Sequence, residues 1–508
     1  ALAGERNLDA LLQQVTQQTR QISQADGALT YLYNEKANSL EPSFLDIAAQ
    51  ESGHIEGIPT FSLAEESELV VALGKKDSSV LELSSQQPSE LNVLLEKLET
   101  DTVKIIALPL RNRQENIIGI LCLLYKDPDE NNDHIAFVRA LSGFAAVSLE
   151  SRQLLMMQKA LLESFIKLIA GAIDSKSPYT GGHCARVPEL AKLIAQAACD
   201  SDSKPFQDFQ LNEEQWEALH IASWLHDCGK VTTPEYVVDK ATKLETLYDR
   251  IHEIRMRFEV LKRDAEIDYW QQISQGAEPD TLYPQLMKKH QQLDQDFAFI
   301  AKCNEGGEFM AEEQVQHLYE IAEYTWLRTL DDRLGVSWEE SQRQQKSAPQ
   351  SLPVVEKLLA NKLEHLIERE SGDQMPDNNP WGFRLEVPAY KYNRGELYNL
   401  AIERGTLTAE ERFKINDHIV QTIIMLEELP YPSHLTDVPM IAGSHHEKMD
   451  GTGYPKQLLS EQMPLTGKMM ALADIFEALT ASDRPYKHAK SLSEALRIMS
   501  FMVKDKHI

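Results

Sequence analysis

A long stretch without helix-breaking residues is the feature that most restricts how this chain can fold. Between Leu149 and Gly171 the sequence contains neither glycine nor proline. Apolar residues recur there every seven positions, at Val147, Leu154, Leu161 and Leu168. Such a repeat is typical of a helix that pairs with another helix. We therefore predict a linker helix over 149–172 that joins two domains and pairs with its twin in a homodimer. The alternative is a helix packed on its own domain.

The residues before this helix alternate between apolar runs and polar turns. A helix is predicted over 7–24, and strands for GALTYLYNE, SELVVAL, TVKIIALPLR and IIGILCLLY. A helix from about 134 to 152 follows. This order predicts an α+β domain over 1–148, with an antiparallel sheet flanked by helices. It resembles a GAF domain, above all in IALPLRNRQENIIGILCLLYKD. The resemblance implies a sensor whose ligand is unknown, and a plain α+β fold without a ligand is the alternative.

The charge balance excludes broad binding to nucleic acid polymers. Lys and Arg total 51 against 79 Asp and Glu, which gives a net charge of −28. An anionic substrate would therefore need a local cationic device such as a metal centre. The cysteines show no CxxC spacing, and the longest apolar run, 117–125, is about half of what a bilayer span requires. We expect a cytoplasmic protein, and a fragment of a longer one, so that an upstream membrane anchor stays open.

The segment over 240–395 has a different pattern of apolar residues and is predicted to be a helical insertion. Apolar residues at spacings of three and four form a seam there: Leu244, Leu247, Ile251, Ile254, Phe258, Leu261 and Ala265. Further helices are predicted at about 282–302, 311–331 and 352–370. Three arrangements would cover the seam: packing within the insertion, contact with a second subunit, or a lid over the cleft. We expect the insertion to control assembly or access and not the chemistry.

Histidines and acids recur in apolar helical surroundings on both sides of this segment. They are His183, the pair His226-Asp227, His418, the pair His445-His446, and Asp474. A single histidine of this kind is most often a hydrogen-bonded structural residue. Imidazole and carboxylate together suit iron, manganese or zinc, and a carboxylate next to a histidine can bridge two ions. Two such ions can clamp a phosphodiester and activate a water at neutral pH.

The motifs in which these residues lie resemble the HD-GYP phosphodiesterases, a branch of the HD metal-dependent phosphohydrolase superfamily. HDCGK fits HDxGK, LTAEERFKINDH fits LTxEE…H, and HHEKMDGTGYP fits HHExxDGxGYP. The resemblance implies an all-α phosphohydrolase domain over 173–508, interrupted by the insertion. It implies that one metal is held by His183, His226, Asp227 and Asp474, and the second by Asp227, His418, His445 and His446. The position where some members hold a third metal is Tyr179, which favours two ions per chain, iron or else manganese.

Substrate contacts are expected around this centre. Lys230 follows the HD pair by about one helical turn and would reach a phosphate. Arg484 and Lys487 resemble the phosphate-binding pair of the family, with a spacing from Asp474 one residue longer than usual. The loop at the mouth of the site would contribute Asp450, Gly451, Gly453, Tyr454 and Pro455. Glu447 is expected to orient the ligand histidines.

The resemblance implies a phosphodiesterase that hydrolyses cyclic di-GMP to pGpG, and onward to GMP, under control of the GAF-like domain. Lys230 and Asp227 would carry the chemistry. The residues alone do not distinguish guanine from adenine, so 3′,3′-cyclic GMP-AMP stays open as the substrate. A catalytically silent signalling protein is the remaining alternative, with the GYP loop as the contact for a diguanylate cyclase. The complete set of ligand residues argues against silence.

Overall fold

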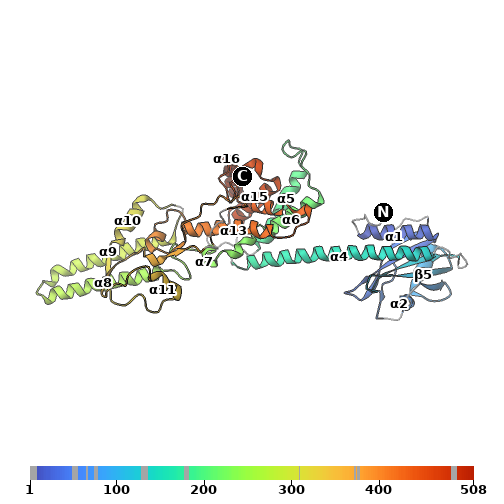
Figure 1. The fold of residues 1–508 in the computed structure, drawn as a ribbon, viewed down its shortest axis with the longest axis horizontal. Coiled ribbons are helices and arrows are strands. Elements are labelled where there is room, and N and C mark those ends of the chain that lie inside the picture. The colour runs from blue at the N-terminus through green and yellow to red at the C-terminus, as the bar shows by residue number, and fades with distance from the viewer. Residues whose placement is uncertain are drawn as a thin grey trace. The chain divides into compact units, whose positions relative to one another are not determined.

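The computed structural model describes residues 8–48, 55–64, 67–73, 78–127, 135–176, 182–307, 309–370, 373, 378–481 and 489–508. The chain divides into two compact units, residues 1–164 and 165–508. A single helix, α4 (Ile135–Asp174), begins in the first unit and ends in the second (Figure 1). The uninterrupted helix that the sequence predicts is therefore confirmed. In the described part of the chain no helix is both long and apolar enough to cross a lipid bilayer.

The first unit is built on a six-stranded antiparallel sheet with the strand order β3-β2-β1-β6-β5-β4. Its strands are β1 (Gly27–Asn34), β2 (Ser39–Ile47), β3 (Phe61–Ser62), β4 (Ser79–Ser84), β5 (Thr102–Arg111) and β6 (Ile117–Tyr125). The helices are α1 (Leu8–Ser23), α2 (Glu68–Leu73) and α3 (Val93–Leu98), together with the start of α4. A 3-10 turn, η2 (Glu90–Asn92), precedes α3.

Both faces of this sheet are buried, which explains the continuous apolar run of β6. Ile120, Cys122 and Leu124 pack into a core with α3, while Leu121 and Leu123 pack into a second core with α1 and α4. Alternate side chains of a strand point to opposite faces, so a strand covered on both sides needs apolar residues throughout. The predicted strands over 27–35, 102–111 and 117–125 are confirmed. The predicted strand at 67–73 is wrong, because α2 occupies it, and β2, β3 and β4 were not predicted.

The HD-like part of the second unit is helical. It consists of α5 (His183–Cys199), α6 (Glu213–Leu225), α7 (Glu235–Val238), α13 (Ala409–Glu427), α14 (Val438–Gly443), α15 (Leu465–Thr480) and α16 (Leu492–Lys504). Short 3-10 turns join them: η3 (Cys228–Thr232), η6 (Ser433–Leu435) and η7 (Ser460–Gln462). The end of α4 packs with α5, α6, α14 and α15 around one apolar core that includes Ile166, Val187, Ala222 and Met470. This core supports the side chains described below.

The insertion is partly helical. Its helices are α8 (Ile251–Ser274), α9 (Pro279–Glu305), α10 (Glu312–Ala322) and α11 (Trp338–Gln344), and the short helix α12 (Glu396–Leu400) follows directly after it. The helices α8 and α9 form a hairpin (Figure 1). Two small antiparallel sheets complete it, β7 (Thr325–Arg328) with β8 (Val354–Lys357), and β9 (Leu366–Glu368) with β10 (Tyr390–Asn393). The helix predicted at 352–370 is therefore wrong, since β8, the turn η4 (Leu363–His365) and β9 lie there.

The apolar seam of the insertion packs mainly within the insertion itself. Ile251, Ile254 and Phe258 are buried against residues of α9 and α10, and Leu261 is partly buried there. Leu247 is different, because 92% of its surface is exposed. Of the three arrangements considered for the seam, the structure shows self-packing for its central part.

Candidate metal centre

Two groups of buried ligand atoms meet around Asp227. In the first group, the Nε2 atom of His183 lies 3.4 Å from Asp227 Oδ2 and 3.3 Å from Asp474 Oδ1. The Nε2 atom of His226 lies 3.3 Å from Asp227 Oδ2. The ligand atoms of His183, His226 and Asp227 all fall within 4.8 Å of one another. This spacing would let a single cation contact all three.

The second group faces the other oxygen of the same carboxylate. His418 Nε2 lies 3.3 Å and His445 Nε2 lies 4.0 Å from Asp227 Oδ1. His446 Nε2 lies 3.3 Å from His418 Nε2. These three histidines also offer ligand atoms within 4.8 Å of one another. The structure thus brings together all seven predicted ligands, with Asp227 between the two groups.

Three of the histidines are oriented by the same kind of hydrogen bond, from the ring to a backbone carbonyl. The Nδ1–H group of His226 donates to the carbonyl of Ser223 at 2.8 Å, three residues earlier. His418 and His445 donate in the same way to the carbonyls of the third residue before each, at 2.5 and 2.7 Å. A carbonyl can only accept, so the proton must lie on Nδ1. The Nε2 lone pair is thereby left free for a cation.

A glycine allows the two halves of the site to approach each other. Gly229 lies in η3, and its backbone N–H donates to Thr422 Oγ1 on α13 at 2.9 Å. A Cβ atom built on Gly229 would lie 1.9 Å from the carbonyl oxygen of His418. Only a residue without a side chain fits there, because packed interiors leave no such space. The glycine of the HDCGK motif therefore sets the distance from Asp227 to His418.

Two buried polar atoms indicate that a cation fits. His226 Nε2 and Asp227 Oδ1 have no hydrogen-bond partner among the described residues, although both residues are almost fully buried. Leaving a buried donor or acceptor unpaired costs about 1–3 kcal/mol each. A divalent cation between the two groups would satisfy both atoms. The donor set of imidazoles and carboxylates suits iron, manganese or zinc.

The protonation states of most ligands also fit a metal. Burial and the neighbouring His226 lower the pKa of His445 to about 4, and burial with His445 and His418 lowers the pKa of His446 well below its ordinary value. Burial alone would raise the pKa of Asp227, but Lys230 and the surrounding imidazoles outweigh it and lower that pKa strongly. Neutral imidazole and ionised carboxylate are the forms that bind metals.

His183 is held by a pair of residues that the sequence reasoning missed. Its Nδ1 atom lies 2.5 Å from Glu477 Oε2, and Arg186 donates to Glu477 Oε1 through Nε and Nη2 at 2.8 and 2.5 Å. Glu477 follows Asp474 by three residues on α15, so both point from the same helical face. That spacing was the available signal. The acid orients the ring of His183 as carboxylates do behind metal-binding histidines.

The GYP loop lies against the second group of histidines. The ring of Tyr454 stacks on that of His446, with centroids 4.9 Å apart and planes at 22°. Gly451 adopts a φ of +79°, and a Cβ on Gly453 would lie 2.3 Å from the backbone nitrogen of Lys448. The Asp450 carboxylate accepts from the backbone N–H and hydroxyl of Thr452. The carbonyl of Pro455 accepts from the N–H of Arg384 in the insertion, at 2.7 Å.

The remaining predicted residues fall in different places. The carboxylate of Glu447 accepts from the backbone N–H groups of Lys456 and Leu458 at 2.7 and 2.9 Å, and so holds the GYP loop. Within the described residues it makes no hydrogen bond to a candidate ligand histidine. Lys230 Nζ lies 2.6 Å from Asp227 Oδ2, and its side chain is 29% exposed. Tyr179, Arg484 and Lys487 lie outside the described residues.

Comparisons with known families match two stretches of the chain. Residues 7–149 match the model of the GAF domain, and residues 353–508 match the model of the HD domain. The HD match includes His418, His445, His446 and Asp474 but not the residues of the HDCGK motif. The chain thus carries a GAF domain followed by an HD domain, and the antiparallel sheet and the helical bundle are their folds.

The curated relatives share a short part of this chain. A cyclic di-GMP phosphodiesterase of Vibrio cholerae is 41% identical over 105 residues, 20% of this chain and 21% of its own. A cyclic di-GMP phosphodiesterase of Thermotoga maritima is 38% identical over 98 residues, 19% of this chain and 26% of its own. A 3′3′-cGAMP-specific phosphodiesterase 3 of Vibrio cholerae is 38% identical over 95 residues, 19% of this chain and 20% of its own. The chain therefore spans about a fifth to a quarter of the length of these relatives.

Among solved structures, a GAF domain/HD domain protein from Geobacter sulfurreducens is similar to 30% of this chain over 99% of its own, with 17% identity and a TM-score of 0.24.

Proposed function

We propose that this chain, which carries a GAF domain and an HD domain, is a metal-dependent phosphodiesterase that hydrolyses cyclic di-GMP to pGpG and onward to GMP. The observation that carries the proposal is the position of Asp227, whose two carboxylate oxygens face two separate groups of buried histidines. That arrangement is what a site for two bridged cations requires. The names of the relatives supply the substrate class.

Each side chain has a distinct part in this proposal. His183, His226 and Asp474 would hold one ion, His418, His445 and His446 the other, and Asp227 both. When bound, two divalent cations supply an activated water and positive charge for the phosphoryl oxygens. Lys230 adds a further cation beside them: burial opposes its charge, but the adjacent Asp227 outweighs that and raises the pKa of Lys230. Its ammonium stays charged at neutral pH and can contact a phosphate oxygen. Iron is our first choice of metal and manganese the second.

The second candidate substrate is a mixed cyclic dinucleotide, because one of the relatives is named as specific for 3′3′-cGAMP. Protein purified without oxygen should be assayed with equal concentrations of cyclic di-GMP and 3′,3′-cyclic GMP-AMP, with chromatography of the products. We expect faster loss of cyclic di-GMP and the appearance of pGpG. Faster loss of the mixed dinucleotide would replace the proposed substrate, and no loss of either would overturn the proposed function.

The bond that breaks can be identified in labelled water. Attack at phosphorus places an oxygen-18 atom on the new terminal phosphate of pGpG. Label found only on the ribose would contradict attack at phosphorus.

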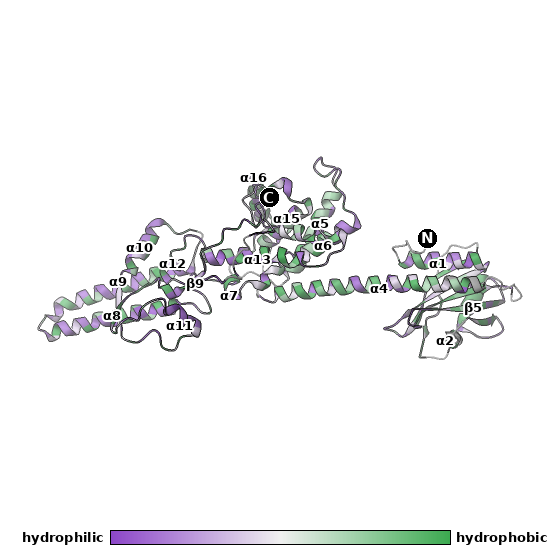
Figure 2. Cartoon of the chain, in the orientation of Figure 1, coloured by the Kyte–Doolittle hydropathy of each residue, from purple (hydrophilic) through white to green (hydrophobic). Residues whose placement is uncertain are grey.

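We further propose that the GAF domain regulates this activity through a dimer formed by α4. Hydrophobic residues recur along this helix (Figure 2). Several of them expose large parts of their surface: Phe144 at 73%, Leu154 at 59%, Leu161 at 57%, Phe165 at 54% and Leu168 at 66%. They follow the alternating spacing of a two-stranded coiled coil, and a second copy of the chain carries the same repeat. Exposed apolar surface of this kind is costly in water.

Light scattering coupled to gel filtration tests the dimer. Replacing Leu161 and Leu168 by Glu should convert a dimer of the full chain into a monomer with its metal content unchanged. The matched control is a pair of Glu substitutions at Gln153 and Lys159, which lie outside the repeat of the leucines. A wild-type monomer, or a dimer that survives the leucine changes, would contradict pairing through α4.

A further inference from the structure

A cavity of about 380 Å³ lies between the insertion and α13, the helix that carries His418. We call it the insertion pocket. Its lining balances three cations, Arg369, Lys391 and Lys414, against three carboxylates, Asp373, Glu410 and Asp417, and adds the aromatic rings of Trp381 and Phe413. Half of these residues come from the insertion and half from α13. Small-molecule sites typically have this size and this mixture of aromatic surface and a few polar groups.

The cationic side chains of the pocket could donate hydrogen bonds to a ligand. Arg369 Nε donates to the carbonyl of Pro388 at 2.7 Å, and its guanidinium carbon lies 4.6 Å from the centre of the Phe413 ring. These two contacts fix the group in place. Its Nη2 atom is buried and meets no hydrogen-bond partner in the described part of the chain. Lys391 and Lys414 add two ammonium groups, each paired with one carboxylate, at 2.6 and 3.2 Å.

The aromatic side offers flat surface for stacking. The partly exposed ring of Trp381 lies parallel to that of Phe383, with centroids 5.6 Å apart and planes at 14°. Phe383 in turn packs on Val420 and Ile423 of α13, which anchors this segment. A nucleobase stacks on such rings, and an arginine donates to the O6 and N7 atoms of guanine or to phosphate.

Three features connect the pocket to the candidate metal centre. Lys414 and Gln421 line it, and they lie four residues before and three residues after His418, on the same face of α13. Thr232 also lines it, two residues after Lys230. The hydrogen bond from Arg384 to the GYP loop ties the same segment of the insertion to the mouth of the site.

We propose that the insertion pocket receives one guanine nucleotide half of the substrate while the scissile phosphate of the other half lies at the metals. The proposal rests on the proposed function and adds to it the element that recognises the substrate. A cyclic dinucleotide has two bases and two phosphates, so the half away from the metals needs its own stacking surface and cation. The insertion supplies both. Its role is then substrate recognition, in addition to any part in assembly or access.

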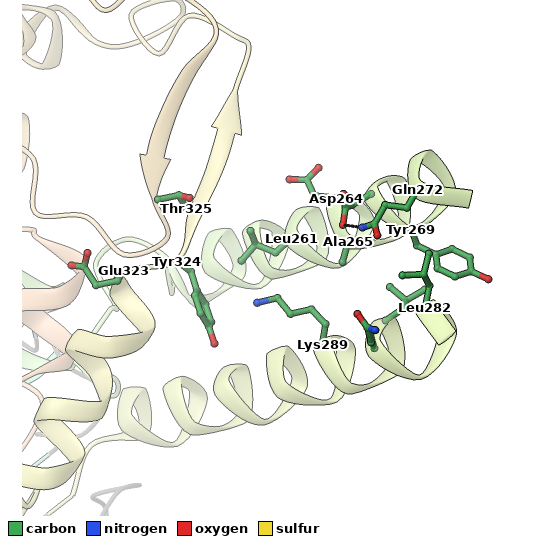
Figure 3. A pocket seen from close by; sticks show the side chains of 13 residues that line it. Leu261, Asp264, Ala265, Tyr269, Gln272, Leu282, Lys289, Glu323, Tyr324 and Thr325 are labelled. Atoms are coloured by element: carbon green, nitrogen blue, oxygen red, sulfur yellow. Dashed lines mark hydrogen bonds between the residues drawn. The ribbon is translucent and has the colours of Figure 1, made fainter. Parts of the chain in front are cut away.

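A second cavity in the insertion does not suit this role. It has a volume of about 540 Å³ and lies between α8, α9 and the start of β7 (Figure 3). Asp264, Asp268 and Glu323 give it negative charge, and its lysine, Lys289, already lies 4.7 Å from the centre of the Tyr324 ring. Carboxylates in excess repel a dianionic dinucleotide. Its lining comes from α8, α9 and residues 323–325, and none of it from α13, the helix that carries His418.

Steady-state kinetics on the full metal-loaded chain separates recognition from chemistry. Two substrates are compared, cyclic di-GMP and bis(4-nitrophenyl) phosphate, which offers a phosphodiester without guanine. Arg369→Ala and Lys391→Ala should each raise KM for cyclic di-GMP about tenfold or more, as expected for a lost charged hydrogen bond. Their metal content and their turnover of bis(4-nitrophenyl) phosphate should match the wild type. Arg369→Lys should recover part of the loss, and Lys357→Ala on β8, outside the pocket, is the matched control.

The outcomes distinguish this inference from the proposed function. An unchanged KM for cyclic di-GMP in both alanine variants would overturn the insertion pocket while leaving the phosphodiesterase intact. An equal loss on both substrates would also overturn it, because the residues would then support the metal centre. If the wild type cleaves bis(4-nitrophenyl) phosphate but not cyclic di-GMP, the proposed substrate is wrong. The pocket is then judged by equilibrium dialysis with 3′,3′-cyclic GMP-AMP, where unchanged binding by Arg369→Ala would refute it.

Discussion

The substitution Gly229→Ala, which adds one methyl group, should disrupt the candidate metal centre. The added Cβ of Gly229→Ala would lie 1.9 Å from the carbonyl oxygen of His418 and 2.6 Å from the backbone nitrogen of Thr422. Both obstacles are backbone atoms of α13, so no side chain can rotate away. To relieve the clash, η3 and α13 must separate by more than about 1 Å, because packed interiors leave no slack.

The cost can be worked from the contacts that separation breaks. Overpacking a buried site costs about 1–3 kcal/mol. Loss of the hydrogen bond from the Gly229 N–H to Thr422 adds about 1 kcal/mol. We therefore expect the free energy of unfolding of the second unit to fall by about 2–4 kcal/mol. The same shift moves Asp227 away from His418, whose atoms now lie 3.3 Å apart, so the shared carboxylate would no longer reach both groups.

Urea unfolding of the metal-free chain and elemental analysis of the purified chain measure the two effects. Gly171→Ala is the control, since a Cβ there meets no atom within 4 Å and an alanine favours the helix α4 by up to about 1 kcal/mol. The reasoning is refuted if Gly229→Ala retains the wild-type stability and metal content.

Three further predictions concern other contacts in the second unit. Glu477→Ala removes the hydrogen-bond partner of His183, so it should weaken metal binding about 10- to 100-fold in a chelator competition. An unchanged metal affinity would show that this contact is dispensable. Burial opposes the charge of His183, but Asp227, Asp474 and Glu477 outweigh it and raise its pKa to about 11. His183 is therefore protonated below that pH, and its proton must leave before a metal can bind. Metal binding at pH 8 should release about one proton per chain, and the affinity should rise with pH. Calorimetry in buffers of different ionisation enthalpy measures the proton release. The ammonium of Lys240 lies 2.7 Å from the buried carboxylate of Glu411. Lys240→Met leaves that carboxylate without its cation, so urea unfolding should show the second unit destabilised by about 3–5 kcal/mol. A loss below about 1 kcal/mol would contradict this reason.

The candidate metal ligands could be found in the sequence because they lie in short continuous motifs, and the structure brings them together. The partners of those ligands could not. Glu477 lies 294 residues from His183 along the chain, and an acid on a helix gives no local sign of such a contact. Only its spacing of three from Asp474 hinted that it shares the inward face of α15.

The errors in secondary structure also have physical causes. SELVVAL is a short apolar run, which fits a strand or a helix equally well. In the structure Leu69 is buried while Val71 is 58% exposed, and two residues apart on a strand would share a face. Around Val354 the strand β8 forms by pairing with β7, whose residues precede it by about 30 positions. Pairing over that distance leaves no periodic signal in either segment.

Elemental analysis of the wild type and of Asp227→Ala, both purified without oxygen, tests whether the Asp227 carboxylate is shared by two metal ions. We predict close to two iron or manganese ions per wild-type chain. The variant should lose most of its metal and all turnover of cyclic di-GMP, since Asp227 faces both groups of histidines. An Asp227→Ala variant that keeps two ions, or that remains active, would contradict the account.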